Sequence, residues 1–316
     1  MFAAGGVLQP RFFDCILPGV KEYNGQVEYV HQNPVRAGLG SETRIYFFHI
    51  DRKGGKMIPK LSRGLAMGNF IGALILQSIL LLTWTQAASA QKLPSYTIYR
   101  TPSPITIDGK LNEPAWRRAP VADHFHFNWW QGRKKEPTVV RMLWDDQNLY
   151  VAYYCYDQHT DAKITEPQGP VSTDDSVEFY ARPNPDKLDF NGIEINSICT
   201  LLGFRMRNGK AQMEWYPEGV RCKTASYPGH WIMELAIPLK NYSDLAAHTP
   251  PHNGDRWKVN LNRIDLIGSA NATHRQYQYS TWSPVHTPMP NFHVPEAFGW
   301  VKFVNRKPPR HSPKAK

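Results

Sequence analysis

The stretch VVRMLWDDQNLYVAYY, residues 139–154, gives the clearest indication of the fold. Two runs rich in β-branched, aromatic and other apolar residues flank the polar sequence DDQN at 145–148. Runs of this kind about a four-residue polar loop are typical of a β-hairpin. The stretch therefore predicts two antiparallel strands, 139–144 and 149–154.

Similar runs continue toward the C-terminus, with turn residues between them. They predict strands at 176–181, 193–202, 203–207, 231–237, 257–264, 277–282 and 300–304. The one helix that the pattern predicts is short and lies in LNEPAWRRA, residues 111–119, with Asn112 as its cap and Pro114 in its first turn. Many short strands without long helices predict an all-β fold, an antiparallel β-sandwich over residues 91–305.

Composition and charge exclude several classes of protein. A chain that is 41% hydrophobic and 20% charged is not wholly disordered, collagen-like or a polytopic membrane protein. Its net charge of +10 would indicate nucleic acid or an anionic surface as a partner if it were evenly spread. Residues 91–305, however, hold 23 basic and 22 acidic side chains, so no nucleic-acid partner is expected for this domain. Residues 306–316 hold five basic and no acidic side chains and predict a disordered tail.

Residues 57–90 have the three-part layout of a secretory signal peptide. Lys60 and Arg63 form a basic start, an apolar run follows at 70–82, and Ala-Ser-Ala ends at Ala90. We expect cleavage near Ala90 and a bacterial protein that is secreted or periplasmic. A segment that is not removed would act as an internal membrane anchor, and a buried core helix is the alternative interpretation of the apolar run.

The residues before this segment carry a different pattern. The motif YVHQNPVRAGL, within residues 11–39, resembles the C-terminal end of small bacterial REP-associated tyrosine transposases. The histidine pair that holds the metal ion in that family falls in a part that is absent, and a tyrosine nucleophile such as Tyr23 or Tyr29 needs that cation. Residues 1–56 are therefore interpreted as an inert transposase remnant, with a working transposase fusion as the alternative.

Three cysteines fall in the predicted domain: Cys155, Cys199 and Cys222. Their spacing contains no C-x-x-C, which argues against a zinc site or attachment of a c-type haem. Cys199 and Cys222 lie on predicted strands that could be neighbours, so a disulfide between them is one option. Cys155 is expected to pack in the core as a small apolar residue.

An ordered set of motifs over residues 104–304 resembles carbohydrate-binding module family 9 and its looser DOMON-like relatives. The motifs are ITIDGKLNEPAW, MLWDDQNLYVAYYCYD, DDSVEFY, WIMELAIPL, WKVNLNRID and the ending WSP…NFHVPEAFGWVKF. The resemblance implies a non-catalytic β-sandwich that binds plant-type polysaccharides or their oligosaccharides and serves carbohydrate catabolism. Such sites stack aromatic rings on the sugar and place polar groups around its edge.

The resemblance also implies site residues. Glu178 falls on the sugar-binding glutamate of the family, Asn262 on an amide that binds a hydroxyl, and Phe292 on one of two stacking tryptophans. Asn260 and Asn262 alternate with apolar residues and so share the face away from the core.

The chain departs from the family pattern at other positions. Ser172 stands where the second tryptophan is expected, and Glu194 stands where an arginine is expected. Asn196, two residues after Glu194, is a further candidate for binding the sugar. The remaining candidates for lining the site are Trp129, Trp130 and Trp282.

Carboxylates allow two further hypotheses. The cluster of Asp174, Asp175 and Glu178 could supply the acid and base of a glycoside hydrolase. Loop carboxylates, including Asp145 and Asp146, could instead hold a structural calcium ion. No other cofactor is expected, and none of the common nucleophile or phosphate-binding motifs occurs.

A haem-binding, DOMON-like electron-transfer domain is the remaining alternative. His286 and His293, with Met289 between them, are residue types that serve as axial haem ligands.

Overall fold

The computed structural model describes residues 92–268 and 276–309. The predicted transposase remnant (1–56), the predicted signal peptide (57–90) and the end of the basic tail (310–316) lie outside the described residues. Within the described part of the chain, no helix is long and apolar enough to cross a membrane.

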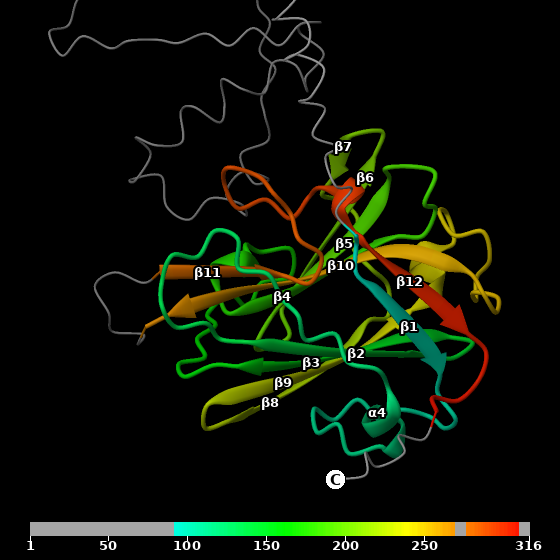
Figure 1. Ribbon diagram of the computed structural model, residues 1–316, viewed down its shortest axis with the longest axis horizontal. Helices are drawn as coiled ribbons and strands as arrows, with labels where there is room; N and C mark the ends of the chain where they lie inside the picture. The colour runs from blue at the N-terminus through cyan, green and yellow to red at the C-terminus, as the bar shows by residue number, and fades with distance from the viewer. Residues whose placement is uncertain (1–91, 269–275, 310–316) are drawn as a thin grey trace, which may run out of the picture. The chain divides into compact units, whose positions relative to one another are not determined.

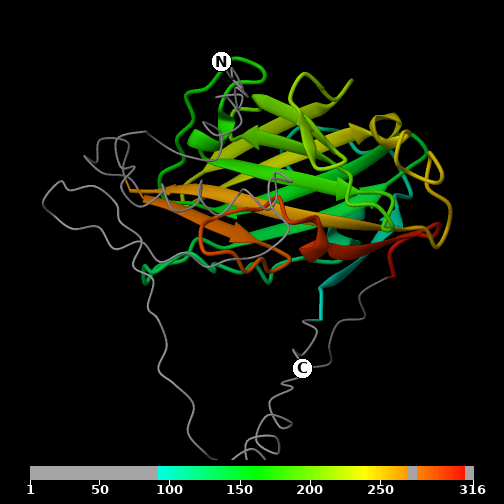
Figure 2. The same cartoon turned by 90° about the horizontal axis from the view of Figure 1, so that it is seen from above.

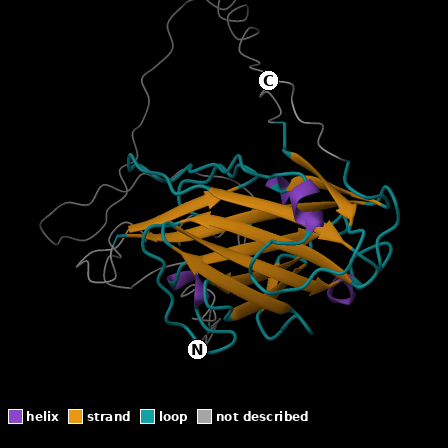
Figure 3. Cartoon of the chain, turned by 90° about the horizontal axis from the view of Figure 1, so that it is seen from below, coloured by secondary structure: helices purple, strands orange, loops and turns teal. Residues whose placement is uncertain are grey.

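The described residues form a domain built almost wholly from strands (Figure 3). Its strands are β1 (Ser95–Arg100), β2 (Thr138–Trp144), β3 (Asn148–Tyr156), β4 (Ser176–Arg182), β5 (Phe190–Asn196), β6 (Leu201–Arg207), β7 (Lys210–Gln212), β8 (Arg221–Tyr227), β9 (His230–Pro238), β10 (Arg256–Ile267), β11 (Gln276–Thr281) and β12 (Gly299–Val304). Its helical elements are α4 (Pro114–Arg118) and the 3-10 turns η2 (Val171–Thr173), η3 (Leu239–Tyr242) and η4 (Pro295–Ala297).

The strands follow one hydrogen-bonded path, β7-β6-β5-β4-β10-β12-β1-β2-β3-β9-β8, with β11 on the free part of β10 (Figure 1). The path curls back on itself, so that β4, β5 and β10 form one layer and β2, β3 and β9 form the other (Figure 2). Apolar side chains from both layers meet in one core cluster between them. The prediction of an all-β sandwich is therefore confirmed.

The sheet is mixed rather than purely antiparallel, which corrects the prediction. β1 pairs in parallel with β12, with Ser95 opposite Trp300, and also in parallel with β2. Parallel neighbours need a long connection, and here almost the whole domain connects β1 to β12. Strand patterns in a sequence do not reveal such pairing, because it joins segments about two hundred residues apart.

Most predicted strands are present with shifts of one to three residues at their ends, but the predicted strand at 193–202 is wrong. The chain turns after Asn196 and resumes as β6 at Leu201. The side chain of Asn196 accepts a hydrogen bond from the backbone of Thr200 at 2.8 Å, and Cys199 has a left-handed φ of 68°. Apolar residues follow closely on both sides of this turn, at Ile195, Ile198 and Leu201, and concealed it. The short strands β1, β7 and β8 were not predicted.

The turn between β5 and β6 is also the site of the disulfide. Cys199 is bonded to Cys222 on β8, with 5.8 Å between their Cα atoms, and Cys155 is a free, buried thiol. The disulfide and the core position of Cys155 are confirmed, but Cys199 lies in a turn rather than on a strand next to β8.

The motif around α4 is structural. α4 covers part of the outer face of the second layer, where the Trp116 indole donates to Glu234 Oε1 at 2.9 Å. The other carboxylate oxygen of Glu234 accepts hydrogen bonds from the backbone of Asp108 and Gly109. The helix is capped at Glu113 without a side-chain bond, so the prediction of Asn112 as the cap is wrong.

The alternation of side chains along β4 determines on which face of the sheet the candidate site lies. Val177 and Phe179 point into the core between the layers, which leaves Ser176, Glu178 and Tyr180 on the outer face. Every residue of β4 is nevertheless buried, because a second apolar cluster packs over this outer face. The polar residues on it are thus enclosed rather than solvated.

Candidate carbohydrate-binding site

Three polar residues meet on one row of the outer face of the first layer. On β4, Glu178 lies directly opposite Asn262 of β10 on one side and Glu194 of β5 on the other. Directly opposite residues of paired strands have Cβ atoms about 4.5–5.5 Å apart. All three side chains are buried, so the row forms a compact polar cluster inside the domain.

Hydrogen bonds connect the cluster. Asn262 Nδ2 donates to Glu178 Oε2 at 3.1 Å. The Tyr180 hydroxyl donates to Glu194 Oε1 at 2.9 Å and lies 3.1 Å from Nε2 of His293. The imidazole of His293 also stacks on the Tyr180 ring, with 5.1 Å between ring centroids.

Burial changes the ionisation of these groups. It raises the pKa of Glu194 to about 7, and burial together with the neighbouring Glu194 raises the pKa of Glu178 well above its usual range. Burial lowers the pKa of His293 to about 4. Below pH 7 the cluster is therefore mainly neutral, and protonated carboxyl groups can donate as well as accept hydrogen bonds.

Part of the hydrogen-bonding capacity of this face is unused. Four buried polar atoms on it have no hydrogen-bond partner among the described residues: Ser176 Oγ, Glu194 Oε2, Asn260 Nδ2 and Asn262 Oδ1. Leaving a buried polar group unpaired costs about 1–3 kcal/mol. Such groups in a native structure indicate a place where water or a ligand completes the bonding.

Residues 283–298, here called the cover segment, lie over this face. Phe292 is 5% exposed and packs edge-on against Trp129, with ring centroids 5.6 Å apart. The Trp129 indole donates to the carbonyl of Thr287 at 2.8 Å, which joins the two segments. The structure thus brings Glu178, Asn262, Phe292 and Trp129 to the same face of the sheet.

Asn196, another predicted site residue, is fully engaged within the domain. Its Nδ2 donates to Asp174 Oδ2 and to the carbonyl of Ile164, each at 2.8 Å. Its Oδ1 accepts the backbone bond from Thr200. Asn196 therefore orders the loops beside the site.

The remaining predicted residues lie in other environments. Trp282 is 4% exposed and packs in the core between the layers. The Trp130 indole donates to the carbonyl of Lys134 within a surface turn, at 2.7 Å. Ser172 lies in η2, which packs on β4 and β5. The structure does not bring either tryptophan into the Glu178 cluster.

Sequence reasoning missed three members of the cluster. The sequence predicts Glu194 only as a departure from the family pattern and His293 only as a candidate haem ligand, and it does not single out Tyr180. Tyr180 follows Glu178 by two residues on a strand, so alternation could have placed it on the same face. No sequence signal links His293 to β4.

The other carboxylates named in the sequence are bound by nearby donors. Asp145 accepts hydrogen bonds from the backbone of its own turn and from a tyrosine, and Asp146 pairs with Arg100. The Asp174 carboxylate accepts hydrogen bonds from the backbone N–H of Ile164 and from the side-chain amide of Asn196. Both oxygens of Asp175 accept backbone hydrogen bonds. These contacts stabilise loops and strand ends.

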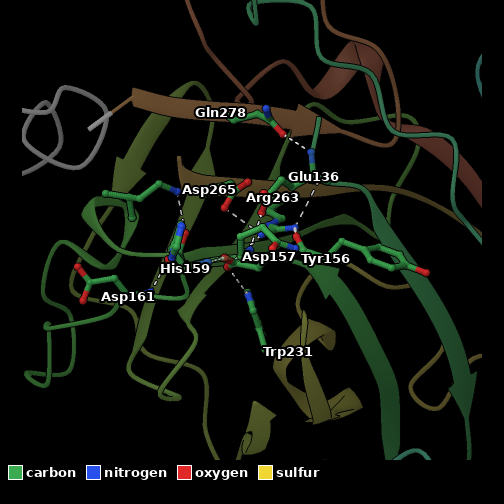
Figure 4. A network of polar contacts seen from close by, with 12 residues as sticks. Glu136, Tyr156, Asp157, His159, Asp161, Trp231, Arg263, Asp265 and Gln278 are labelled. Atoms are coloured by element: carbon green, nitrogen blue, oxygen red, sulfur yellow. Dashed lines mark hydrogen bonds and ion pairs between the residues drawn. The ribbon is translucent and has the colours of Figure 1, made fainter. Parts of the chain in front are cut away.

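A second buried group of carboxylates lies on the other side of β10 (Figure 4). Glu136, Asp157 and Asp265 each offer an oxygen atom, and these atoms lie within 4.8 Å of one another. The buried guanidinium of Arg263 donates to Asp157 at 3.2 Å and to Asp265 at 3.0 Å. These three carboxylates could hold the structural calcium considered for the loop carboxylates, but Arg263 already supplies positive charge to two of them.

The residues considered for haem are spread over different environments. His293 is enclosed and lies against Tyr180, whereas His286 and Met289 are at the surface. Nε2 of His293 is within hydrogen-bonding distance of the Tyr180 hydroxyl.

The fold and this site together define a β-sandwich binding module, in which polar groups of one outer sheet face lie beneath aromatic residues. The profile of the family described as carbohydrate family 9 binding domain-like matches residues 107–306. The match covers more than half of the sequence, and the chain belongs to this family.

Three solved structures are similar to this chain, and the first shares its fold. A candidate carbohydrate-binding protein from Bacteroides uniformis ATCC 8492 is 18% identical, with a TM-score of 0.56, and the match covers 67% of this chain and all of that one. Two structures of a family 9 carbohydrate-binding module from Caldicellulosiruptor kristjanssonii, in complex with cellotriose and with glucose, are 16% and 17% identical. Their TM-scores are 0.47 and 0.45, with 71% and 68% of this chain and all of theirs covered. No curated protein matches the sequence.

Proposed function

We propose that this protein binds carbohydrate without catalysis, through the outer face of β4, β5 and β10. The observation that carries the proposal is the set of unpaired buried polar atoms around Glu178, Glu194 and Asn262. A sugar ring presents hydroxyls that donate and accept, and it could pair with these atoms where no protein group does. Membership of a family of carbohydrate-binding domains supports the same ligand class.

The neutral state of the cluster suits an uncharged sugar. Two carboxyl groups with raised pKa values offer both donors and acceptors without bringing a buried negative charge against the ligand. Phe292 and Trp129 supply aromatic surface beside the polar row. We further propose a polysaccharide of the plant type, or its oligosaccharides, as the physiological ligand and carbohydrate catabolism as its role.

Entry of a sugar requires a change at the cover segment. Phe292 and His293 lie over the face and Glu178 is 3% exposed, so the polar row is enclosed. We propose that the cover segment moves away as ligand enters and that Phe292 then stacks on the sugar.

Affinity gel electrophoresis and calorimetry test the proposal. The panel contains glucose, cello-oligosaccharides, xylan and other neutral glycans. Wild type should bind at least one of them, and Asn262→Ala and Phe292→Ala should weaken that binding about tenfold or more, since each removes a contact to the ligand. Glu214→Gln, which changes an exposed carboxylate, is the matched control and should bind as wild type does. Absence of binding to every glycan would contradict the proposal.

A glycoside hydrolase is the second candidate, and the pairing of Glu178 with Glu194 is the observation that favours it. Retaining glycosidases keep their two carboxyl groups about 5–5.5 Å apart, which resembles the spacing of opposite residues on paired strands. Their mechanism also needs one carboxylate ionised, whereas burial favours the neutral form of both groups here. Release of reducing sugar that disappears in Glu178→Gln would establish hydrolysis and refute a purely binding role.

We also propose that the domain is exported after cleavage near Ala90. The basic start, apolar run and small-residue exit of residues 57–90 support this proposal. N-terminal sequencing of protein from the culture medium or periplasm should begin at Gln91. A product that begins at Met1 would contradict both the cleavage and the interpretation of residues 1–56 as a remnant.

A further inference from the structure

A second set of polar residues lies on the outer side of β10, where this strand pairs with β12 and β4. Arg256 is directly opposite Lys302 of β12, and Lys258 is directly opposite Arg182 of β4. Trp300 of β12 lies on the other side of Lys258. Like charges placed directly opposite one another destabilise a sheet. We call these five residues the basic face.

No carboxylate of the described residues forms a close ion pair with the basic face. Glu296 acts at longer range on Lys258 and Arg182, and Asp186 acts on Arg182. Within the described part of the chain, no carboxylate oxygen lies within 4.0 Å of the cationic atoms of these four side chains. Lys258 Nζ donates instead to the backbone carbonyl of Glu296 at 3.0 Å, and Arg182 donates to backbone carbonyls, including that of Pro295 at 3.0 Å. Carbonyl oxygens accept these hydrogen bonds without cancelling the positive charge.

The indole of Trp300 contacts two cations of the basic face. The Arg256 guanidinium lies 4.3 Å from the centroid of the indole ring and the Lys258 ammonium lies 5.1 Å from it. Both distances are within the range of a cation–π interaction. The ring therefore contacts one exposed cation, Arg256, and one buried cation, Lys258.

The accessible part of the basic face combines charge with hydroxyl groups. Arg256 and Lys302 are exposed. On the neighbouring strand β1, Ser95 lies opposite Trp300 and Thr97 lies opposite Lys302 (Figure 1). Two cations, two hydroxyls and the partly exposed edge of an indole thus occupy adjacent positions on three strands.

We propose that the basic face binds an acidic polysaccharide through its carboxylate groups. The guanidinium of Arg256 can engage a carboxylate with two parallel hydrogen bonds, Lys302 can pair with a second carboxylate, and the β1 hydroxyls can bond to sugar hydroxyls. A domain with a net charge of +1 lacks the broad positive field that binds nucleic acid. The positive charge of the basic face therefore acts only on groups that contact it. The face is separate from the Glu178 row, since Lys258 and Asn262 are four residues apart, about 13 Å along the strand.

The test uses the full chain and two polymers with the same backbone. Affinity electrophoresis compares polygalacturonate with its fully methyl-esterified form, which carries no charge. Wild type should be retarded by the acid form and not by the ester. Arg256→Gln/Lys302→Gln should weaken binding about fivefold or more. The matched control, Arg221→Gln/Lys223→Gln, also removes an exposed arginine and an exposed lysine, here from β8, and should bind as wild type does.

Several outcomes would overturn the proposal. Equal losses in the two double variants would show that overall charge, rather than this face, is responsible. Tighter binding to phosphatidylglycerol vesicles or to duplex DNA, lost in the same variant, would assign the face to another partner.

Thermal unfolding distinguishes a binding face from a structural one. Arg256→Gln/Lys302→Gln removes a pair of opposed like charges together with the contact of Arg256 with Trp300, so its midpoint should stay within about 3 °C of that of wild type. A larger fall would mean that the two cations stabilise the fold, and it would count against the proposal. Binding of a neutral glycan at the Glu178 row should be unchanged in this variant.

Discussion

Replacing Glu194 by glutamine should stabilise this protein in a manner that depends on pH. Glu194 is buried, and burial raises the pKa of its carboxyl group from an ordinary 4.5 to about 7. The amide of glutamine resembles the protonated carboxyl in shape, and its oxygen can still accept the bond from Tyr180. The variant thus removes the ionisation and keeps the packing.

The size of the effect follows from the change in pKa. The folded-state pKa lies above the unfolded value, so the folded protein binds more protons, and stability falls as pH rises from about 4.5 to 7. A difference of about 2.5 units corresponds to about 3 kcal/mol, which is fully expressed above pH 7. Glu194→Gln avoids this loss, and at about 2–4 °C per kcal/mol its unfolding midpoint at pH 8 should exceed that of wild type by roughly 6–12 °C.

Thermal and urea unfolding at pH 5 and pH 8 measure the difference. At pH 5 the advantage of the variant should fall to about 1 kcal/mol, because Glu194 is then protonated in the folded protein and ionises mainly in the unfolded chain, where its pKa is 4.5. Glu214→Gln removes an exposed carboxylate and should show no comparable dependence. A variant that gains equally at both pH values, or that is less stable at pH 8, would refute the assignment of a strained, buried carboxyl.

Three further predictions concern the remainder of the domain. Cys199→Ser/Cys222→Ser opens a loop with a sequence separation of 23 residues, so the free energy of unfolding measured with urea should fall by about 3 kcal/mol; an equal loss in wild type treated with reductant would confirm the cause. Trp116→Phe leaves a buried oxygen of Glu234 without its indole donor and should cost about 1–3 kcal/mol in the same assay, whereas an unchanged midpoint would show that this bond contributes nothing. Calcium and chelator should leave the thermal midpoint unchanged, because Arg263 supplies the cation of the buried carboxylate group, and a rise of several degrees with calcium would instead show that the ion binds.

Local patterns in the sequence were sufficient to predict much of the fold. The hairpin of β2 and β3 was predictable because two apolar runs and their polar loop are adjacent in the chain. Glu178 and Asn262 were placed on an outer face by alternation and by the family resemblance, and the structure brings them within hydrogen-bonding distance. The turn after Asn196 was harder to predict, since apolar residues resume within two positions of it and no glycine or proline marks it.

Contacts between segments that are distant in the sequence determined the features that local patterns could not predict. Glu194 became part of the site only because β5 pairs with β4 in the register that places it opposite Glu178. Trp282, one of the three tryptophans considered for sugar stacking, packs in the core instead. An aromatic residue has the same local sequence signal whether it stacks on a ligand or fills a core, so only packing can distinguish the two.

The sequence by itself determined the class of fold, the family and the outward position of the first polar residues, because each depends on the order and alternation of neighbouring residues. Only the tertiary structure shows that the polar row is enclosed beneath residues 283–298. Only the tertiary structure shows that two cations of β10 lie directly opposite cations of β4 and β12. Enclosure and charge opposition arise from strand register and from segments packed across the sheet. Neither is encoded in any local stretch of the chain.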